Sequence, residues 1–434
     1  MCTIGFFKII SCKSVSASVL ATVLVVSALM LLLVLGVLML WNTDFVFFSR
    51  VEYLSRQRAN VESAFVLYSV DSTLTDRLDE QRGLQLYDSS SDSRIQIEIC
   101  PWGLYEVVRV QAADARIAST RLFGVVDPVV PLRNNCCNLW YVTQGATLSL
   151  TGRTALHGYL RLPRNGVQYG QIRSTFFCGE QVVNEHTAYA GEKLPALRSN
   201  VRSRIDTLFD WLVKSELWEP IGSQLITGFC DGLPLLLDAG PFCANLHVEG
   251  MSILVGDEIT LDSTCRLNDV LVVGRMIRVE EGFQGRAQLF AEDTLLVGDQ
   301  VNLRYPSGVF VARKNPKRYL EIGANSRVEG YAIVDGVGEY NVKQLNYRQA
   351  RTAVLRGLLW VDGSAQVQGI VLGCIVANGL VYYSSEGYYE DMLYDLTLLE
   401  NPAMAYPLWA VSQYKRKEAG WLHGENEAME SQNL

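Results

Sequence analysis

One uncharged apolar run near the N-terminus constrains the fold of this chain most. Residues Val19 to Trp41 read VLATVLVVSALMLLLVLGVLMLW, and none of them carries a charge. A helix needs about 20 apolar residues to cross the hydrocarbon core of a bilayer, so this run is long enough. A cleaved signal peptide has a shorter apolar region that ends in small residues. Here the chain continues as Asn42-Thr43-Asp44, so we expect an uncleaved, single-pass transmembrane helix over 19–41.

The basic residues on either side of this run are nearly balanced. Lys8 and Lys13 precede it, whereas Arg50, Arg56 and Arg58 follow at a greater distance. We expect residues 1–18 to be a short leader that remains in the cytoplasm while the large body crosses the membrane, because the short segment carries Lys8 and Lys13 close to the span. The chain would then be in contact with membrane lipid, with its body outside the cytoplasm.

The helix should continue beyond the membrane. No Pro or Gly occurs from residue 37 to residue 82, and apolar residues recur at three-, four- and seven-residue steps. The residues that follow this helical period are Val51, Leu54, Val61, Phe65 and Tyr68. This period predicts an amphipathic helix over 42–83 whose apolar face packs on its own domain, with docking on a partner helix as the alternative.

Composition excludes several classes of protein. Of the 434 residues, 49% are apolar and only 19% are charged, so there is enough apolar material for a folded core of two or three units. The 38 basic and 46 acidic residues give a net charge of −8, so we expect no nucleic acid partner. The four His residues are scattered, and the chain contains no G-x-S-x-G, P-loop or H-E-x-x-H motif. We therefore expect no catalytic site, no metal and no cofactor.

The period changes to two after Arg94. Ile95, Ile97 and Ile99 alternate with polar residues, and Pro101-Trp102-Gly103 reads as a turn. A further strand is predicted over residues 116–126. This pattern indicates an antiparallel β meander over 94–143. A long N-terminal helix followed by such a meander is the plan of a pilin-like subunit.

Short β-rich runs punctuated by glycine fill the rest of the chain. They cover residues 144–190 and return over 241–400, where Val-Gly, Ile-Gly or Leu-Gly pairs end the runs at Gly256, Gly274, Gly298, Gly323 and Gly373. The first step, of 18 residues, suits one coil of a β-solenoid, with inward apolar residues and glycines of positive φ at the corners. The alternative is a β-sandwich with irregular strands. The clearest coil is Tyr319 to Gly336, where Ile322 and Val328 should point inward.

Two segments interrupt or follow the predicted solenoid. Residues 191–240 should form a helical insertion, because Val201, Ile205 and Leu208 recur at a helical spacing. Residues 401–434 should form a C-terminal tail whose last ten or so residues are disordered. The fold class we expect is therefore mainly β, with a transmembrane helix continuing into an amphipathic helix, then antiparallel hairpins and a β-solenoid with an α insertion.

An aromatic cluster follows the last clear coil. It consists of Tyr382, Tyr383, Tyr388 and Tyr389. An open solenoid end exposes strand edges and apolar core, so it needs a cap or a partner. Tyrosine suits both roles, because it combines a large apolar area with a polar tip. These four residues are our candidates for a cap or an interface.

Several blocks of the sequence together resemble known membrane proteins. The leader Lys13-Ser14-Val15-Ser16-Ala17-Ser18, running directly into the anchor, resembles the start of pseudopilins and of PilX-like minor pilins. The blocks LSLTGRTALHGYLRLPRNGVQYGQI, LRGLLWVDGSAQVQGIVLGCIV and GLVYYSSEGYYEDMLYDLTL resemble uncharacterised single-pass membrane proteins of Bacteroidetes. The coil around Ile322 is similar to bactofilin-type β-helices. The resemblance implies structural motifs and no catalytic residues. It also implies a bacterial inner membrane as the location, with the body in the periplasm.

Taken together, these patterns predict a non-enzymatic, membrane-anchored structural or assembly protein of the cell envelope, linked to a type IV pilus- or type II secretion-like apparatus. Its partners would be pilin-like or secretion-apparatus proteins, and self-association stays open. The alternatives are a periplasmic or surface carbohydrate-active β-helix enzyme and an envelope-binding module.

Overall fold

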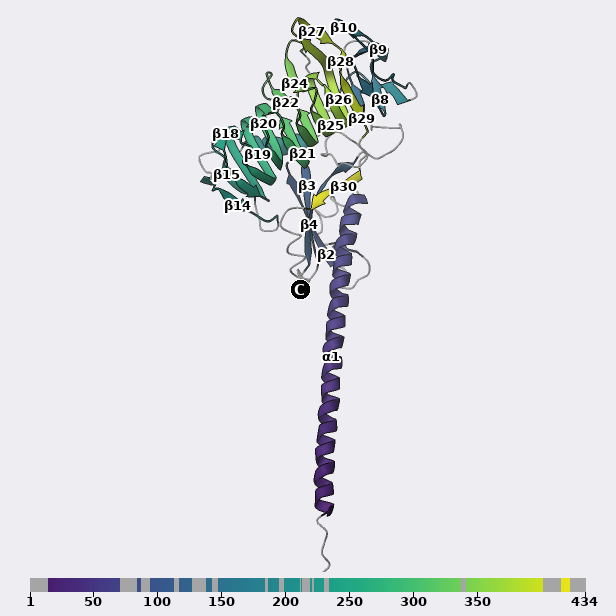
Figure 1. Cartoon of the computed structure of the whole chain (residues 1–434), viewed down its shortest axis with the longest axis vertical. Helices are drawn as coiled ribbons and strands as arrows, with labels where there is room; N and C mark the ends of the chain where they lie inside the picture. The colour runs from purple at the N-terminus through teal and green to yellow at the C-terminus, as the bar shows by residue number, and fades with distance from the viewer. Residues whose placement is uncertain are drawn as a thin grey trace, which may run out of the picture.

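A single long helix carries a β-rich body at its C-terminal end (Figure 1). The computed structural model describes residues 15–70, 84–86, 94–112, 117–126, 138–142, 147–183, 186–194, 199–210, 212, 219–220, 222–229, 234–336, 341–400 and 415–421. The prediction of a mainly β chain with a long N-terminal helix and antiparallel hairpins is confirmed. The predicted leader up to residue 14, the end of the predicted helix (71–83) and most of the predicted tail (401–414 and 422–434) lie outside the described residues.

Helix α1 (Val15–Val70) is continuous over 56 residues, or about 84 Å at the usual helical rise. The absence of Pro and Gly after Gly36 explains why it does not break. Its apolar first half is exposed along the whole stretch from Val19 to Phe48. Its second half is buried on one side, where Val61, Phe65 and Tyr68 pack on the body.

An antiparallel sheet receives the packed half of this helix. Its strand order is β1-β2-β3-β4-β30, with bounds Leu84–Gln85, Arg94–Trp102, Tyr105–Ala112, Ala118–Val126 and Lys415–Trp421. Alternation along β2 buries Ile95 and Ile97 against the helix. Strand β30 comes from the C-terminal part of the chain and pairs with β4, so the predicted tail segment supplies the edge strand of the N-terminal sheet.

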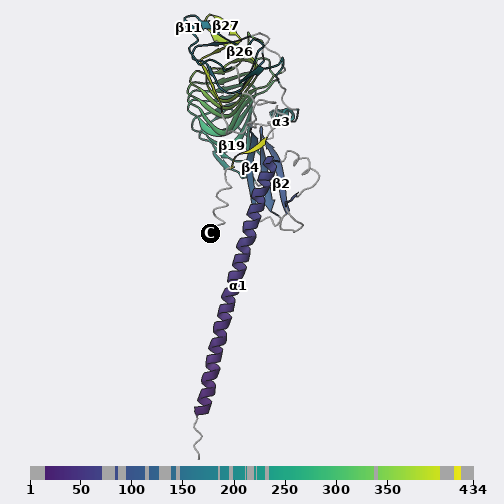
Figure 2. The same ribbon diagram turned by 90° about the vertical axis from the view of Figure 1, so that its right-hand side faces the viewer.

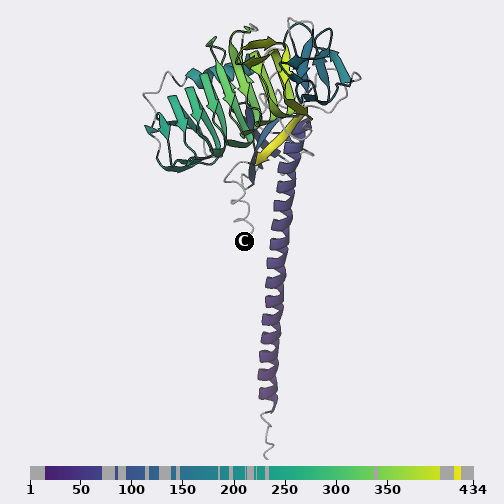
Figure 3. The same ribbon diagram turned by 45° about the horizontal axis from the view of Figure 1, so that its top comes forward.

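The rest of the described chain is built mainly from strands that pair in parallel and stack across the body (Figure 3). Their pairings close on themselves. These strands are β5 (Leu139–Tyr141), β7 (Ala155–Leu156), β8 (Leu160–Leu162), β12 (Thr187–Tyr189), β13 (Glu219–Pro220), β14 (Gln224–Ile226), β15 (Leu235–Asp238), β16 (Phe242–Cys243), β17 (His247–Glu249), β18 (Ser252–Leu261), β19 (Arg266–Val279), β20 (Gln284–Val297), β21 (Asn302–Val311), β22 (Tyr319–Ile322), β23 (Arg327–Val334), β24 (Leu345–Gln349), β25 (Val354–Gln366), β26 (Gly369–Ser384), β27 (Gly387–Glu390) and β29 (Leu396–Leu399).

Smaller elements complete the described chain. Strand β27 is the exception within the closed set, because it forms an antiparallel hairpin with β26. Strands β28 (Met392–Tyr394), β6 (Leu148–Thr151) and β9 (Val167–Tyr169) form a three-stranded sheet, and β10 (Gln171–Ile172) pairs with β11 (Thr175–Phe176). Within the predicted helical insertion, the structure has one α-helix, α3 (Ser199–Asp210), followed by strands β13 to β15.

Register repeats from strand to strand at the spacing noted in the sequence. Ile259, Ile277 and Leu295 are successive parallel partners, 18 residues apart. All three are buried in one core, enclosed by the parallel strands. Ile322 and Val328 are fully buried in the same core, as the sequence predicts for them.

Four of the five glycines that end the repeated runs lack the positive φ predicted for corners, although Gly282 and Gly369 elsewhere in the body have it. Of the five, only Gly373 has a positive φ, of 144°. A Cβ at Gly298 would lie 2.8 Å from the carbonyl oxygen of Val279, and one at Gly323 would lie 2.6 Å from that of Gly298. Close neighbouring backbone, rather than a left-handed turn, therefore explains these two glycines.

A second core lies on the outer face of the same strands. Leu289 belongs to the enclosed core, whereas the next residue, Phe290, belongs to this outer core, because successive side chains point to opposite faces. Helix α3 and the tip of the β2–β3 hairpin cover it (Figure 2). The Gln288 side chain ties the hairpin down, since its Nε2 donates to the Trp102 carbonyl at 2.9 Å and its Oε1 accepts from the Leu104 amide at 3.0 Å.

Strand order in the stack does not follow the chain. Strand β26, from the C-terminal half, pairs with β5, and β29 pairs with β7. Strand β5 then pairs with β8, and β8 with β12. The segment predicted as the first solenoid part therefore extends the stack beyond the strands of residues 241–400, rather than preceding them.

Candidate functional site

The four tyrosines singled out from the sequence meet in one hairpin. Strands β26 and β27 pair antiparallel, so that Tyr382 faces Tyr389 and Tyr383 faces Tyr388. Tyr388 is exposed, and the other three are half-buried. Partial burial raises the pKa of Tyr382 and of Tyr383 above its ordinary value.

Contacts of the hairpin are made with its own chain. The Tyr383 hydroxyl donates to the carbonyl of Val342, and the Tyr382 ring lies 4.8 Å from the ring of Tyr394. The stack does not stop at this point, because β5 and β29 pair with β26 and carry the parallel sheet further. The hairpin therefore leaves the stack at β26, whereas β5 and β29 continue the stack beyond that strand. Its role as cap or interface stays a prediction.

A second candidate is a polar face that the sequence analysis missed. Along the first residues of β17, β19, β20, β21, β23 and β25, buried residues alternate with polar ones that point outward. We call the outward set the arginine ladder. It consists of His247, Glu249, Arg266, Asn268, Gln284, Arg286, Asn302, Arg304, Arg327, Glu329 and Arg356.

Parallel register aligns these side chains in two rows. Glu249 pairs with Asn268, which pairs with Arg286. In the second row, Gln284 pairs with Asn302, which pairs with Arg327. Neighbours in a parallel sheet are about 4.8 Å apart, so the paired polar groups are closely spaced on a stiff support. The register shifts just after these residues, at Asn268 in β19, Gly285 in β20 and Leu303 in β21.

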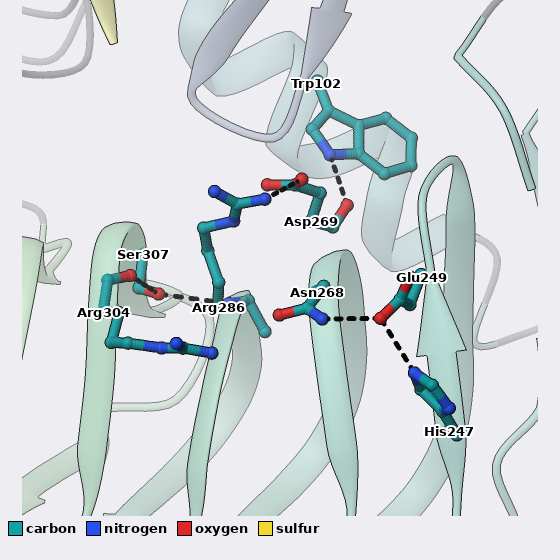
Figure 4. A network of polar contacts seen from close by, with 9 residues as sticks. Trp102, His247, Glu249, Asn268, Asp269, Arg286, Arg304 and Ser307 are labelled. Atoms are coloured by element: carbon teal, nitrogen blue, oxygen red, sulfur yellow. Dashed lines mark hydrogen bonds and ion pairs between the residues drawn. The ribbon is translucent and has the colours of Figure 1, made fainter. Parts of the chain in front are cut away.

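Three side chains form a hydrogen-bonded group at one end of the ladder (Figure 4). Oε1 of the buried Glu249 lies 2.8 Å from Nε2 of His247 and accepts a hydrogen bond of 2.8 Å from Nδ2 of Asn268. Because the carboxylate has these partners, its burial is compensated. His247 and Asn268 thus supply hydrogen-bond partners to this carboxylate.

The next group ties the ladder to the antiparallel sheet. Arg286 forms an ion pair with Asp269, whose backbone has a φ of 60° at the bend of β19. The Trp102 indole donates to the Asp269 carbonyl at 3.0 Å (Figure 4). The ladder and the tip of the β2–β3 hairpin therefore share one anchoring residue.

The remaining arginines are more open. Arg327 Nε and Arg356 Nη1 lie 3.1 Å and 3.8 Å from the same oxygen of Glu329. Arg266 and Arg304 are exposed, and among the described residues neither has a carboxylate partner. The ladder holds five arginines against two glutamates, so it is a cationic surface on a chain with a net charge of −8.

This face had a signal in the sequence. Arg266, Gln284 and Asn302 follow one another at steps of 18, as do Asn268, Arg286 and Arg304. A polar–apolar–polar triplet that repeats with the period of the stack indicates an outward polar row. The Val-Gly pairs Val255-Gly256 and Val273-Gly274 have the same 18-residue period as these triplets, so the period and the polar row could have been predicted together.

The chemistry open to the ladder is recognition of anions. Guanidinium groups donate to carboxylates, phosphates and sulfates in a planar, bidentate geometry. Asn and Gln side chains can both donate and accept, which suits hydroxyl groups. Within the part of the chain that the structure describes, no group of three or more His, Cys, Asp or Glu side chains is placed to hold a metal ion.

Comparison with known proteins adds no family. No family model matches the chain, and no curated protein or solved structure matches it either. The resemblance to pseudopilins and bactofilins therefore stays a prediction.

Proposed function

We propose that this chain is a non-enzymatic structural or assembly protein of the cell envelope, anchored by α1 in the inner membrane with its body in the periplasm. The observation that carries the proposal is one unbroken helix with two different halves. The first half is apolar and exposed, with a mean hydropathy of 3.1 in its most apolar window. The second half is packed on the body.

Buried polar contacts connect helix α1 to the body. The Tyr68 hydroxyl of α1 donates to Oε2 of the buried Glu106 on β3 at 2.5 Å, and Arg204 of α3 lies 3.6 Å from Oε1 of the same carboxylate. Arg121 of β4 forms an ion pair with Glu62 of α1. Because these groups connect the anchor, the sheet and α3, the helix would hold the body in a fixed orientation above the membrane.

We further propose that the parallel body is a β-solenoid. Three observations support this: the 18-residue register between successive partners, the enclosed core and the rows of like residues on the outer faces. A solenoid offers long flat flanks, which suit a protein that positions or links other envelope components. The proposed partners are pilin-like or secretion-apparatus proteins.

Topology reporters test the anchoring role. The full chain is fused at its C-terminus to alkaline phosphatase, which is active only in the periplasm, or to β-galactosidase, which is active only in the cytoplasm. We expect phosphatase activity alone, in membranes that resist carbonate extraction. The matched control replaces Leu32 and Leu33 by Arg, because each charge at the centre of a span costs about 3 kcal/mol.

The control should lose membrane retention, while the wild type keeps it. β-Galactosidase activity without phosphatase activity would contradict the proposed orientation. Release of the wild-type chain by carbonate would contradict the anchor. Co-purification from detergent-solubilised membranes then identifies the partner, and recovery of neither pilin-like nor secretion proteins would contradict the proposed apparatus.

A further inference from the structure

We propose that the arginine ladder binds an acidic polysaccharide, with the polymer lying along the stack and its carboxylates paired with successive arginines. The inference rests on the proposed position of the body outside the cytoplasm, where such polymers occur. It adds a binding activity that anchoring alone does not require.

Charge is the first reason. The chain is acidic overall, yet the five arginines of the ladder still exceed its two glutamates and the paired Asp269 by two charges when His247 is neutral. Arg266 and Arg304 are exposed, and the described residues provide no carboxylate for them. Among these residues, Nη1 of Arg266 donates only to the carbonyls of Ser263 and Cys265, both at 3.4 Å. A guanidinium with no carboxylate partner can pair with an anionic ligand, and no internal ion pair has to break first.

Geometry is the second reason. The strands that carry the ladder are held by buried residues between the polar positions, such as Leu267, Leu303 and Val328. The surface is therefore stiff, and its polar groups recur at about 4.8 Å. A flexible surface would lose conformational entropy on binding, whereas this one is already ordered. A closely spaced series of donors matches a ligand that is itself a repeating polymer.

The mixture of side chains favours a sugar polymer. Asn268, Gln284 and Asn302 stand between the arginines, and their amides suit hydroxyl groups. A polymer with both carboxylates and hydroxyls on each unit satisfies both kinds of side chain. A purely anionic polymer such as polyphosphate can accept from the amide N–H groups, but it offers no donor to the amide oxygens.

An acidic row borders the ladder and limits the width of the ligand. The turns that lead into β19, β20 and β21 carry Asp262, Glu280, Glu281 and Asp299. These carboxylates would repel a wide polyanion such as duplex DNA, whose charges would extend over them. A single polysaccharide chain can lie across the ladder in contact with Arg266 and Arg304 without covering the border.

Distance excludes lipid head groups of the protein's own membrane. After Trp41, the first helix side chain that packs on the body is Leu54, about 20 Å further along the helix. The parallel strands lie at the far end of α1 (Figure 1). Head groups of the bilayer that holds α1 therefore do not reach the ladder.

Binding of defined polymers by the full-length protein tests the proposal. Fluorescently labelled polygalacturonate is titrated with protein held in a neutral polyoxyethylene detergent, and anisotropy is recorded at rising salt. We expect saturable binding that weakens with salt. The double variant Arg266→Gln and Arg304→Gln should weaken it at least about tenfold, because a hydrogen bond to a charged group is worth about 1.5 kcal/mol.

The matched control is Arg348→Gln, on strand β24. Arg348 is also half exposed and lies 3.5 Å from Glu321, outside the ladder. It should bind polygalacturonate as the wild type does. Circular dichroism and the urea midpoint of each variant report folding, so a loss of binding by a folded double variant supports the site. Equal binding by the double variant and the wild type would overturn it.

Three further probes decide the class of ligand. Neutral dextran should not bind, and binding as tight as that of polygalacturonate would refute the role of charge. Duplex DNA and polyphosphate of the same charge should bind at least about tenfold more weakly, and tighter binding of either would refute the polysaccharide. Binding is measured on purified protein, so its result does not depend on topology. The reporter assay can contradict the proposed anchoring while binding is retained. Equally, binding can fail while the reporter assay supports the anchoring.

Discussion

Replacing Leu295 by Ala should destabilise the parallel body by about 3–5 kcal/mol, whereas the same change at Leu296 should cost less than about 1 kcal/mol. Leu295 is fully buried between its partners Ile277 and Leu320. The truncation removes three carbons, worth about 2.4 kcal/mol in transfer alone, and leaves a cavity between neighbouring strands. The side chain of Leu296 points to the other face and is half exposed, so its loss leaves no enclosed cavity.

Urea unfolding of the full-length protein in detergent measures both variants, with tryptophan fluorescence as the probe. The shift in midpoint multiplied by the common slope gives the change in unfolding free energy. Residue type and position along the chain are matched, so the comparison isolates which face each side chain occupies. Equal losses for both variants would refute the enclosed core and its alternation.

Three further changes test separate features. Placing a charge in the core with Ile322→Asp should lower the unfolding free energy by several kcal/mol, and an unchanged melting temperature would show that this residue does not point inward. Burial raises the pKa of Asp335 above its ordinary 3.8, despite the nearby Arg202, so the folded state keeps a proton that the unfolded state has lost. Wild type should therefore lose stability relative to Asp335→Asn as the pH rises from about 4 through the folded pKa, and parallel pH profiles would contradict this. Replacing Tyr383 and Tyr389 by Ser should lower stability if the hairpin is a cap, or release a co-purifying partner from a folded protein if it is an interface; no change in either would exclude both roles.

The sequence predicted the features that depend on residues close together in the chain. The uncharged run from Val19 forms the exposed apolar half of α1, and Ile95 and Ile97 alternate along an antiparallel strand. Val255-Gly256 and Val273-Gly274 are lateral partners in the structure, so their 18-residue step was the true period. Ile322 is buried in the enclosed core next to its lateral partner Val297, and its inward position too was predicted from the alternation around it.

Features that depend on distant segments could not be predicted. Nothing in the sequence near Leu139 indicates that it pairs with Ile375. Both stretches have the apolar alternation of any strand in the stack, and the pairing depends on which strand edge of the folded stack is still unpaired. Likewise, residues 415–421 lack the apolar alternation of a core strand, yet they pair with β4. The arginine ladder was missed because its members are ordinary surface residues until the register aligns them.

The order of strands in the stack has a consequence for how the chain reaches its native state. Strand β5 is synthesised early, but its partner β26 follows only after more than two hundred residues. At a translation rate of about 5–20 residues per second, that is a wait of roughly ten to fifty seconds. Contacts of such long range are slow to form, and unpaired edges attract other chains in the meantime. The first sheet has the same property, because β4 pairs with β30, which is synthesised almost three hundred residues later. We therefore expect both sheets to stay incomplete, with open strand edges, until these distant segments have been made.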